Sequence, residues 1–173
     1  ISHVGPFGWI RRRVVPVGAF IIVTEPLPRE LLDRLLPTRR MATDTKNFVN
    51  FFRTTPDGRL LFGGRARFAT SNPRSDEKSG AILRRQLAAV FPELASVRID
   101  YCWGGMVDMT ANRLPRAGER DGVYYSMGYS GHGTHMATLM GTLMAEIMDG
   151  RAELNPWRGF DWPAIPAHFG NPG

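Results

Sequence analysis

The sequence contains a single cysteine, Cys102, among its 173 residues. One thiol excludes an internal disulfide and is typical of a reducing compartment, so we expect a cytoplasmic location. Long apolar runs are also missing, since the stretches at 19–23 and 139–148 are much shorter than the ~20 residues that cross a bilayer. The composition therefore predicts a soluble chain without a membrane span.

Lysine is scarce, with Lys46 and Lys78 as its only occurrences, yet the net charge is +6 and the pI is near 10.2. Nearly all of the positive charge is arginine, which is spread along the chain and is not interleaved with stacking aromatic residues. We favour a solvated basic surface over nucleic-acid binding. A basic interaction module that binds an acidic partner through these arginines remains an alternative.

Sites for metals and nucleophiles are not evident. His132 and His135 are three residues apart and could share a helix face, but a third ligand at metal-binding spacing is missing, so we expect no metal. Residues 128–131 resemble the nucleophile elbow G-x-S-x-G, but the second glycine comes one position early, which makes Ser130 a poor nucleophile. A P-loop is not present.

The first half of the chain predicts alternating strands and helices. A β-branched run predicts a strand at 13–24, and a helix at 29–36 follows it. The segments 47–53 and 60–64 flank a Thr-Pro-Asp-Gly turn at 55–58, which predicts a β-hairpin.

A second helix is expected to begin with Ser75 as its N-cap. Its apolar face, Leu83, Leu87 and Val90, should lie on the hairpin sheet. After it we expect a strand at 98–104 and a loop at 110–122.

The strongest local pattern is a strand, a glycine-rich turn and a helix from Val123 to Asp149. Gly128, Gly131 and Gly133 let the backbone approach a ligand closely, and a helix that begins there directs unpaired N–H groups and its positive dipole end at one place. The helix repeats small residues every fourth position, at Gly133, Ala137, Gly141 and Ala145. An ordinary tight turn is the alternative, because the order G-x-x-G-x-G is not the G-x-G-x-x-G of a first dinucleotide-binding turn.

Three blocks carry a family resemblance: 100–105 with W-x-G, 109–115 with T-x-x-x-x-P, and 123–133 with G-Y-S-G-H-G. They strongly resemble the C-terminal part of the D-amino acid oxidase-like (DAO family) FAD-dependent oxidoreductases, and within that family the gamma-glutamylputrescine oxidoreductase branch. The hairpin around 57–65 is similar to that of the same branch. The resemblance extends from about residue 14 to 150.

The resemblance implies an α+β fold, in which an α/β FAD-binding element joins an antiparallel substrate-domain sheet, as the C-terminal part of a two-domain flavoprotein. It divides the chain into the end of an upstream FAD-domain segment (1–12), a substrate-binding domain (13–99), C-terminal FAD-binding strands and helix (100–150) and a surface-wrapping tail (151–173). Because the family's dinucleotide fingerprint is missing and the first residue is Ile1, we expect a piece of a longer protein, with the N-terminal FAD-binding half as its partner.

The same resemblance implies which residues bind FAD. The G-Y-S-G-H-G backbone would lie against the pyrimidine end of the flavin ring. The expected cofactor-binding residues are Gly104, Gly128, Tyr129, Ser130, Gly131, His132, Gly133 and Thr134. Some relatives tether FAD through a cysteine, but Cys102 does not fall at that position, so we expect non-covalent FAD.

The implied reaction moves a hydride equivalent from an amine carbon to the flavin, gives an imine that water hydrolyses, and uses oxygen or another electron acceptor. Phe51, Trp103 and Tyr125 are candidates for an aromatic wall around a small-molecule amine, with ordinary core packing as the alternative for each. Arg65 could pair with a substrate carboxylate, although a surface salt bridge is the preferred role.

His135 stands where sarcosine oxidase-like relatives have a carboxylate-binding lysine, which favours an amine or polyamine derivative over a simple α-amino acid. We expect this chain alone to be inactive. A truncated or non-catalytic fragment or subunit of such a flavoprotein is the second alternative.

Overall fold

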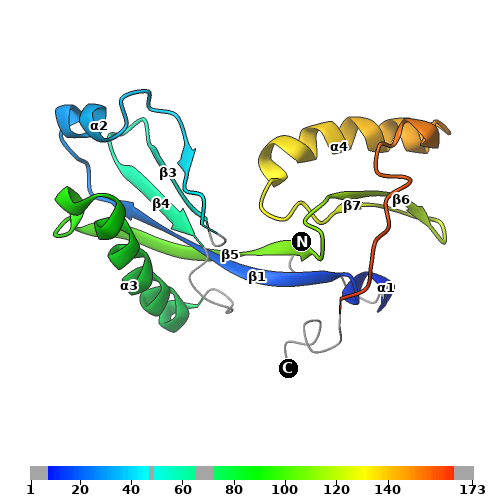
Figure 1. The fold of residues 1–173 in the computed structure, drawn as a ribbon, viewed down its shortest axis with the longest axis horizontal. Coiled ribbons are helices and arrows are strands. Elements are labelled where there is room, and N and C mark those ends of the chain that lie inside the picture. The colour runs from blue at the N-terminus through cyan, green and yellow to red at the C-terminus, as the bar shows by residue number, and fades with distance from the viewer. Residues whose placement is uncertain (1–7, 47–48, 65–71, 166–173) are drawn as a thin grey trace. The chain divides into compact units, whose positions relative to one another are not determined.

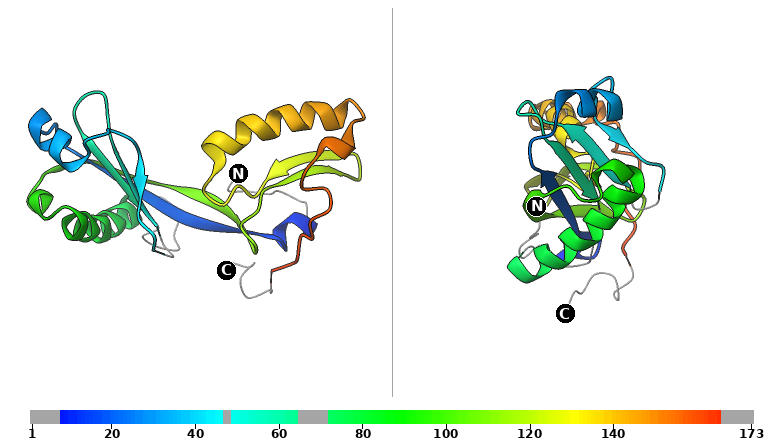
Figure 2. Two further views of the ribbon diagram at one scale, coloured as in Figure 1. Left: turned by 45° about the horizontal axis from the view of Figure 1, so that its top comes forward. Right: turned by 90° about the vertical axis from the view of Figure 1, so that its left-hand side faces the viewer.

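The computed structural model describes residues 8–46, 49–64 and 72–165 (Figures 1 and 2). The chain forms two compact units: Val17–Met106, called here the sheet unit, and Ile1–Pro16 with Val107–Gly173, called the turn unit. Two long strands, β1 (Val14–Thr24) and β5 (Ile99–Thr110), contribute residues to both. The mixed architecture with antiparallel strands confirms the predicted α+β class.

The sheet unit contains a five-stranded sheet of order β2-β3-β4-β1-β5. The short strand β2 is Ala42–Thr43, and the predicted hairpin is confirmed as β3 (Asn50–Thr54) paired antiparallel with β4 (Leu60–Gly64). In the turn that joins them, Gly58 takes a positive φ of 76°. The predicted residues 47 and 48 of the first hairpin strand lie outside the described ranges, as does Arg65.

The helices of the sheet unit are α2 (Arg29–Leu35), α3 (Pro73–Val90) and the 3-10 turn η1 (Pro92–Leu94). The N-cap of α3 is Asn72, so the prediction of Ser75 was wrong. Asn72 Oδ1 accepts from Ser75 N–H at 2.9 Å, while Ser75 Oγ accepts from Asn72 N–H at 3.0 Å. This reciprocal capping box moves the helix start upstream and places Pro73 in the first turn, where a missing N–H costs nothing.

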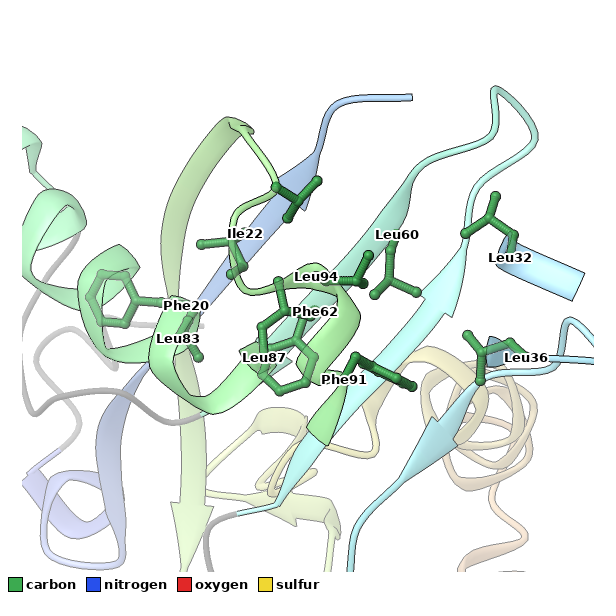
Figure 3. Close-up of a cluster of buried hydrophobic side chains, with 11 residues drawn as sticks. Phe20, Ile22, Leu32, Leu36, Leu60, Phe62, Leu83, Leu87, Phe91 and Leu94 are labelled. Atoms are coloured by element: carbon green, nitrogen blue, oxygen red, sulfur yellow. The ribbon is translucent and has the colours of Figure 1, made fainter. Parts of the chain in front are cut away.

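The core of the sheet unit lies between α3 and one face of the sheet (Figure 3). Leu83 and Leu87 of α3 are fully buried, as the periodicity predicted. They pack in one cluster with strand residues, two from β1 and two from β4: Phe20, Ile22, Leu60 and Phe62. Removing this apolar area from water is the main stabilising contribution to the unit.

A partly buried ion pair fixes the turn end of the hairpin. Arg59 Nη1 donates to Asp100 Oδ2 at 2.6 Å and to the Thr24 carbonyl oxygen at 2.9 Å, while its Nε donates to Asp57 at 2.8 Å. The two partners are each less than one-fifth exposed. One guanidinium therefore ties β1, the hairpin and β5 together at the same place.

In the turn unit, β6 (Arg116–Arg120) and β7 (Val123–Met127) form an antiparallel hairpin. The prediction of a loop across 110–122 was therefore wrong at β6. Its composition is poor in strand formers, and pairing with β7 decides the outcome. Asp121 and Gly122 join the strands with φ values of 54° and 78°, the conformation of a two-residue hairpin turn. Strand β5 also runs six residues past the predicted end at Gly104.

Helix α4 (Gly133–Met148) confirms the predicted helix, and Gly150 beyond its end has a φ of 86°. Its buried side chains, Met140 and Ile147, pack with Ala117 of β6. The unit also contains α1 (Gly8–Arg11) and the 3-10 turn η2 (Ala152–Leu154).

The tail after α4 is irregular, as predicted, and it is anchored by specific contacts. Asn155 Nδ2 donates to the Ala117 carbonyl at 2.7 Å, and the buried Arg116 donates through Nη2 to the Asp161 carbonyl at 2.7 Å. The Trp162 ring packs edge-to-face against the Trp9 ring, with the ring centroids 5.3 Å apart. Among the described helices, none combines the length and the apolar composition needed to cross a membrane.

Replacing Asn72 with alanine should lower the free energy of unfolding by about 1 kcal/mol, because the Ser75 N–H loses its side-chain acceptor at the helix N-terminus. Urea unfolding followed by circular dichroism would measure the change, with Arg85→Ala on the exposed side of α3 as the matched control. Equal stabilities of N72A and R85A would contradict a capping role for Asn72.

Candidate functional site

The glycine-rich turn between β7 and α4 is held by the end of β5. Asp108 Oδ2 accepts from Gly128 N–H at 2.6 Å, and the Asp108 carbonyl oxygen accepts from Ser130 N–H at 3.0 Å. Ser130 Oγ accepts from Thr110 N–H at 3.3 Å and donates to the Gly128 carbonyl at 3.2 Å. Asp108, Thr110 and Ser130 are all buried, so a buried hydrogen-bond network fixes the backbone of the turn.

Three residues of the turn have left-handed backbone conformations: Gly128 (φ 73°), Ser130 (φ 53°) and Gly131 (φ 94°). The two glycines face different surroundings. A Cβ atom on Gly128 would come within 2.5 Å of Thr110 Cγ2, whereas a Cβ on Gly131 would meet no atom within 4 Å. Gly128 is therefore required by internal packing, and Gly131 leaves open space above an exposed backbone.

The start of α4 presents unpaired donors beside this open space. Among the described residues, the N–H groups of Gly131, Gly133 and Thr134 meet no hydrogen-bond acceptor, and the N-cap residue His132 makes no side-chain cap. The same end of the helix carries the positive end of its dipole. Together these groups can hold negative charge or the oxygen atoms of a ring.

The two histidines of the turn are exposed. The His132 and His135 ring centroids lie 5.9 Å apart in an edge-on arrangement. Within the described ranges, no group of three potential ligands is placed to bind a metal ion.

Tyr125 lies in an aromatic cluster of the turn unit. Its ring centroid is 5.1 Å from that of Trp9 and 5.7 Å from that of Trp162. Burial raises the pKa of the Tyr125 hydroxyl above its usual value. Tyr125 thus packs among aromatic rings, and its assignment to a substrate wall stays a prediction.

Phe51 lies on the face of the sheet away from α3. Phe52, Phe62 and Ile22, which occupy one cross-strand row, pack in the α3 core, and their neighbours Phe51, Gly63 and Ile21 form the opposite row. The Phe51 ring lies across Gly63, where a Cβ atom would overlap it.

Trp103 shares this uncovered face. Its neighbours on β5, Cys102 and Gly104, point to the α3 side, where Cys102 meets α3 at Gly80 and Gly104 lies under the Phe20 ring. Trp103 therefore points the other way and is 44% exposed. Two of the three predicted wall residues, Phe51 and Trp103, are thus brought to one sheet face.

Packing alone explains why residue 104 is glycine, since a side chain there would overlap the Phe20 ring. Its assignment to cofactor binding stays a prediction.

Cys102 is half-buried, and its Sγ donates to the Asp76 carbonyl oxygen at 3.2 Å. Burial, helped by the nearby Asp76 carboxylate, raises the pKa of the Cys102 thiol, which keeps it protonated and unreactive.

Comparison with known proteins identifies the family. A family model described as FAD dependent oxidoreductase matches residues 3–147, which is most of the chain. The chain belongs to this DAO family of FAD-dependent oxidoreductases.

Two relatives match this chain over at least nine-tenths of its length. The chain is 36% identical over 158 residues to "Probable oxidoreductase OrdL" of Haemophilus influenzae, covering 90% of this chain and 35% of that protein. It is 35% identical over 165 residues to gamma-glutamylputrescine oxidoreductase of Escherichia coli, covering 95% and 37%. The chain therefore spans little more than a third of the length of these relatives, and the family resemblance drawn from the glycine turn is confirmed.

Solved DAO-fold structures support the architecture. L-proline dehydrogenase from P. horikoshii superposes with a TM-score of 0.68 at 21% identity, covering 84% of this chain and 39% of that one. Glycine oxidase from Geobacillus kaustophilus gives a TM-score of 0.69 at 20% identity, covering 87% and 39%. Both confirm the predicted fold as a part of a larger flavoprotein fold.

The turn fits the cofactor of the DAO family. The open space at Gly131 and the unpaired N–H groups at the start of α4 suit a flat ring with oxygen and nitrogen acceptors at its edge. Asp108 was not predicted, although it supports this turn. A lone carboxylate inside the apolar strand sequence M-V-D-M-T was the available signal, because a buried acid requires strong donors.

Gly128→Ala and Gly131→Ala should differ in stability although both glycines have a positive φ. Each alanine carries a backbone cost of about 1–2 kcal/mol in the left-handed region. Gly128→Ala adds the clash with Thr110, which raises its total cost by about 1–3 kcal/mol. Urea unfolding of both variants checks the order, and a Gly131→Ala protein that is the less stable of the two would contradict the assignment of inward and outward faces.

Proposed function

We propose that the protein is an FAD-dependent oxidoreductase that oxidises the carbon–nitrogen bond of an amine or amino-acid-like substrate, with a polyamine derivative favoured. The observation that supports this most is the open backbone at Gly131 beside the unpaired donors of α4, in a chain of the DAO family. FAD, when bound, supplies the acceptor for a hydride equivalent from the substrate carbon, after which water hydrolyses the imine.

The turn would hold the cofactor by its backbone. The unpaired N–H groups of Gly131, Gly133 and Thr134 would donate hydrogen bonds to it, and the α4 dipole favours negative charge at the same place. The Asp108 network keeps these donors fixed before binding, so little reorganisation is needed. We propose non-covalent binding, since the Cys102 thiol is turned to the α3 side of its sheet.

We propose Phe51 and Trp103 for the substrate wall. Phe51 and Trp103 on the uncovered face provide apolar surface that excludes water and favours the neutral form of an amine, which is the form that can be oxidised. His135 stands where sarcosine oxidase-like relatives hold a carboxylate with lysine, which supports an amine over a simple α-amino acid. The name of the Escherichia coli relative, gamma-glutamylputrescine oxidoreductase, agrees with this substrate class.

The exposed surface of α4 favours a further part of the same protein as partner. Ala137, Gly141 and Ala145 are exposed, and α4 carries a single charged residue, Glu146. Because the match covers only 35–37% of the length of these relatives, we propose that an N-terminal FAD-binding half covers this smooth face and brings the dinucleotide fingerprint. The chain alone would then be inactive, and a cytoplasmic location suits its single thiol.

The basic-module alternative receives less support from the side chains. Several arginines in the described ranges neutralise neighbouring acids, as in the pairs Arg34–Glu93, Arg39–Asp33 and Arg59–Asp100. Such pairs leave less free positive charge for an acidic partner than the composition suggests.

A protein extended to the length of its relatives should be yellow, with flavin absorption bands that bleach when a substrate amine is added without oxygen. Visible spectra recorded with a panel of diamines, acylated diamines and α-amino acids would identify the substrate class. Gly131→Ala should lower the flavin content, because its methyl group enters the open space. A wild-type protein that stays colourless with added FAD would overturn the proposed function.

The flavin should leave the protein completely on acid denaturation. Trichloroacetic acid precipitation of the yellow protein is expected to leave all flavin absorbance in the supernatant. The raised pKa keeps the Cys102 thiol protonated, and the thiol donates a hydrogen bond to the Asp76 carbonyl oxygen. Cys102→Ser provides the matched control and should retain wild-type flavin content. Colour in the wild-type pellet that is lost in the serine variant would show a covalent link instead.

A further inference from the structure

A pocket lies within the turn unit, between the β6–β7 hairpin and the segment that follows α4. Figure 1 shows this segment running beside the hairpin toward α1. The pocket has a volume of about 310 Å³, at the lower end of the range of small-molecule sites. Its walls include four aromatic side chains and two arginines: Tyr125, Trp157, Phe160, Trp162, Arg116 and Arg158.

This pocket and the glycine turn lie at opposite ends of α4. Ile147 near the end of the helix and Ala152 of η2 line the pocket, whereas the glycine turn leads into Gly133 at the helix start. About 20 Å of helix axis separates the two places, at a rise of about 1.5 Å per residue. Among the described lining residues, none belongs to the set predicted to bind FAD.

The pocket wall contains a buried cation, Arg116, which is 3% exposed. Its Nη1 donates to the carbonyl oxygens of Leu114 and Pro115 at 3.2 and 2.9 Å. Its Nη2 donates to Asn112 Oδ1 at 3.1 Å and to the Asp161 carbonyl oxygen at 2.7 Å. These acceptors are all neutral, and within the described ranges no carboxylate pairs with Arg116; burial lowers the pKa of its guanidinium. A buried cation without a counter-ion is costly, so an anion beside it would stabilise the unit.

Three donors on residues of this pocket have no acceptor in the described part of the chain. Arg116 Nε and Trp162 Nε1 are buried and unpaired, and the guanidinium lies over the Trp162 ring, 5.9 Å from its centroid. The Tyr125 hydroxyl is the third, and it lies beside Gly118, its partner across the hairpin, where a Cβ atom would be 3.0 Å from the hydroxyl oxygen. Buried donors are normally paired, so this group indicates a missing acceptor.

The remaining walls combine apolar surface with a net positive charge. Trp157 is half-buried and Phe160 is exposed at the rim, where Arg158 is exposed as well. The acid of the wall, Glu119, is exposed, and its Oε1 accepts from Gly122 N–H in the hairpin turn at 2.5 Å. Such walls suit a flat apolar body with one negative charge, whereas a phosphate would bring more charge and no apolar surface.

We propose that this pocket binds a small aromatic carboxylate as a ligand separate from the amine substrate. The carboxylate would lie against the Arg116 guanidinium and the Tyr125 hydroxyl, which gives the cation a counter-ion and the donors an acceptor. The ring of the ligand would pack on Trp157 and Phe160. This site does not depend on the proposed oxidoreductase activity.

The test measures binding by isothermal titration calorimetry to the protein extended to the length of its relatives. Phenylacetate and phenylacetamide are the probes, because they share one shape and differ in charge. The wild type should bind phenylacetate at least about tenfold more tightly than the amide. Arg116→Gln should weaken phenylacetate binding about 10–100-fold, the effect of a lost charged hydrogen bond, and change amide binding little.

A second variant tests the pocket without removing the contacts of Arg116 to the tail. Ala152 is exposed and lines the pocket, so the ring of Ala152→Phe would occupy it and abolish phenylacetate binding. Ala95→Phe, at an exposed alanine directly after η1, is the matched control and should bind as the wild type does. Thermal unfolding verifies that each variant is folded, and Ala152→Phe decides the matter if Arg116→Gln does not fold.

Gly131→Ala separates this pocket from the cofactor turn. It should bind phenylacetate as the wild type does, whatever its flavin content, and a loss of binding would place the ligand at the turn instead. The proposal is also overturned if acid and amide bind equally, if Ala152→Phe still binds phenylacetate, or if the wild type binds neither, as expected where the N-terminal half covers the pocket. Failure of the proposed function looks different, since the wild type would then bind no flavin and would still bind phenylacetate.

Discussion

The glycine turn depends on one buried carboxylate. Asp108 accepts the Gly128 N–H at 2.6 Å and its own carbonyl accepts the Ser130 N–H, so a single residue of β5 holds two of the three left-handed residues of the turn. Without the carboxylate, the buried Gly128 N–H would lose its partner, whereas the bond from Ser130 N–H to the backbone carbonyl does not depend on the side chain. The exposed N–H groups at the start of α4 are held in place because the N–H groups of Gly128 and Ser130 are already paired.

The glycines of this chain separate into two groups by what surrounds them. Gly63, Gly104 and Gly128 each lie against a neighbouring side chain that occupies the place of a Cβ atom: Phe51, Phe20 and Thr110. Gly131 has no such neighbour and a φ of 94°. The first group is explained by packing within each unit, whereas at Gly131 the positive φ, rather than a neighbouring side chain, accounts for glycine.

Elements with a strong local pattern were predictable from the sequence. The hairpin around Thr55-Pro56-Asp57-Gly58, the buried face of α3 and the turn before α4 follow from turn chemistry and periodicity. Strand β6 was not, because its residues favour no strand and its pairing with β7 is a tertiary effect. The sequence also misplaced the cap of α3, since Ser75 fits the capping pattern equally well as the third helical residue.

Strand β5 makes the chain intolerant of length changes at one place. Trp103 and Asp108 lie on the same continuous strand, and the side chains between them alternate between the two sides. Deleting a single residue between them would turn one of the two to the wrong side, either taking Trp103 from the uncovered face or taking Asp108 from the turn. The number of residues between Trp103 and Asp108 is therefore a requirement of the strand, independently of which residues fill the intervening positions.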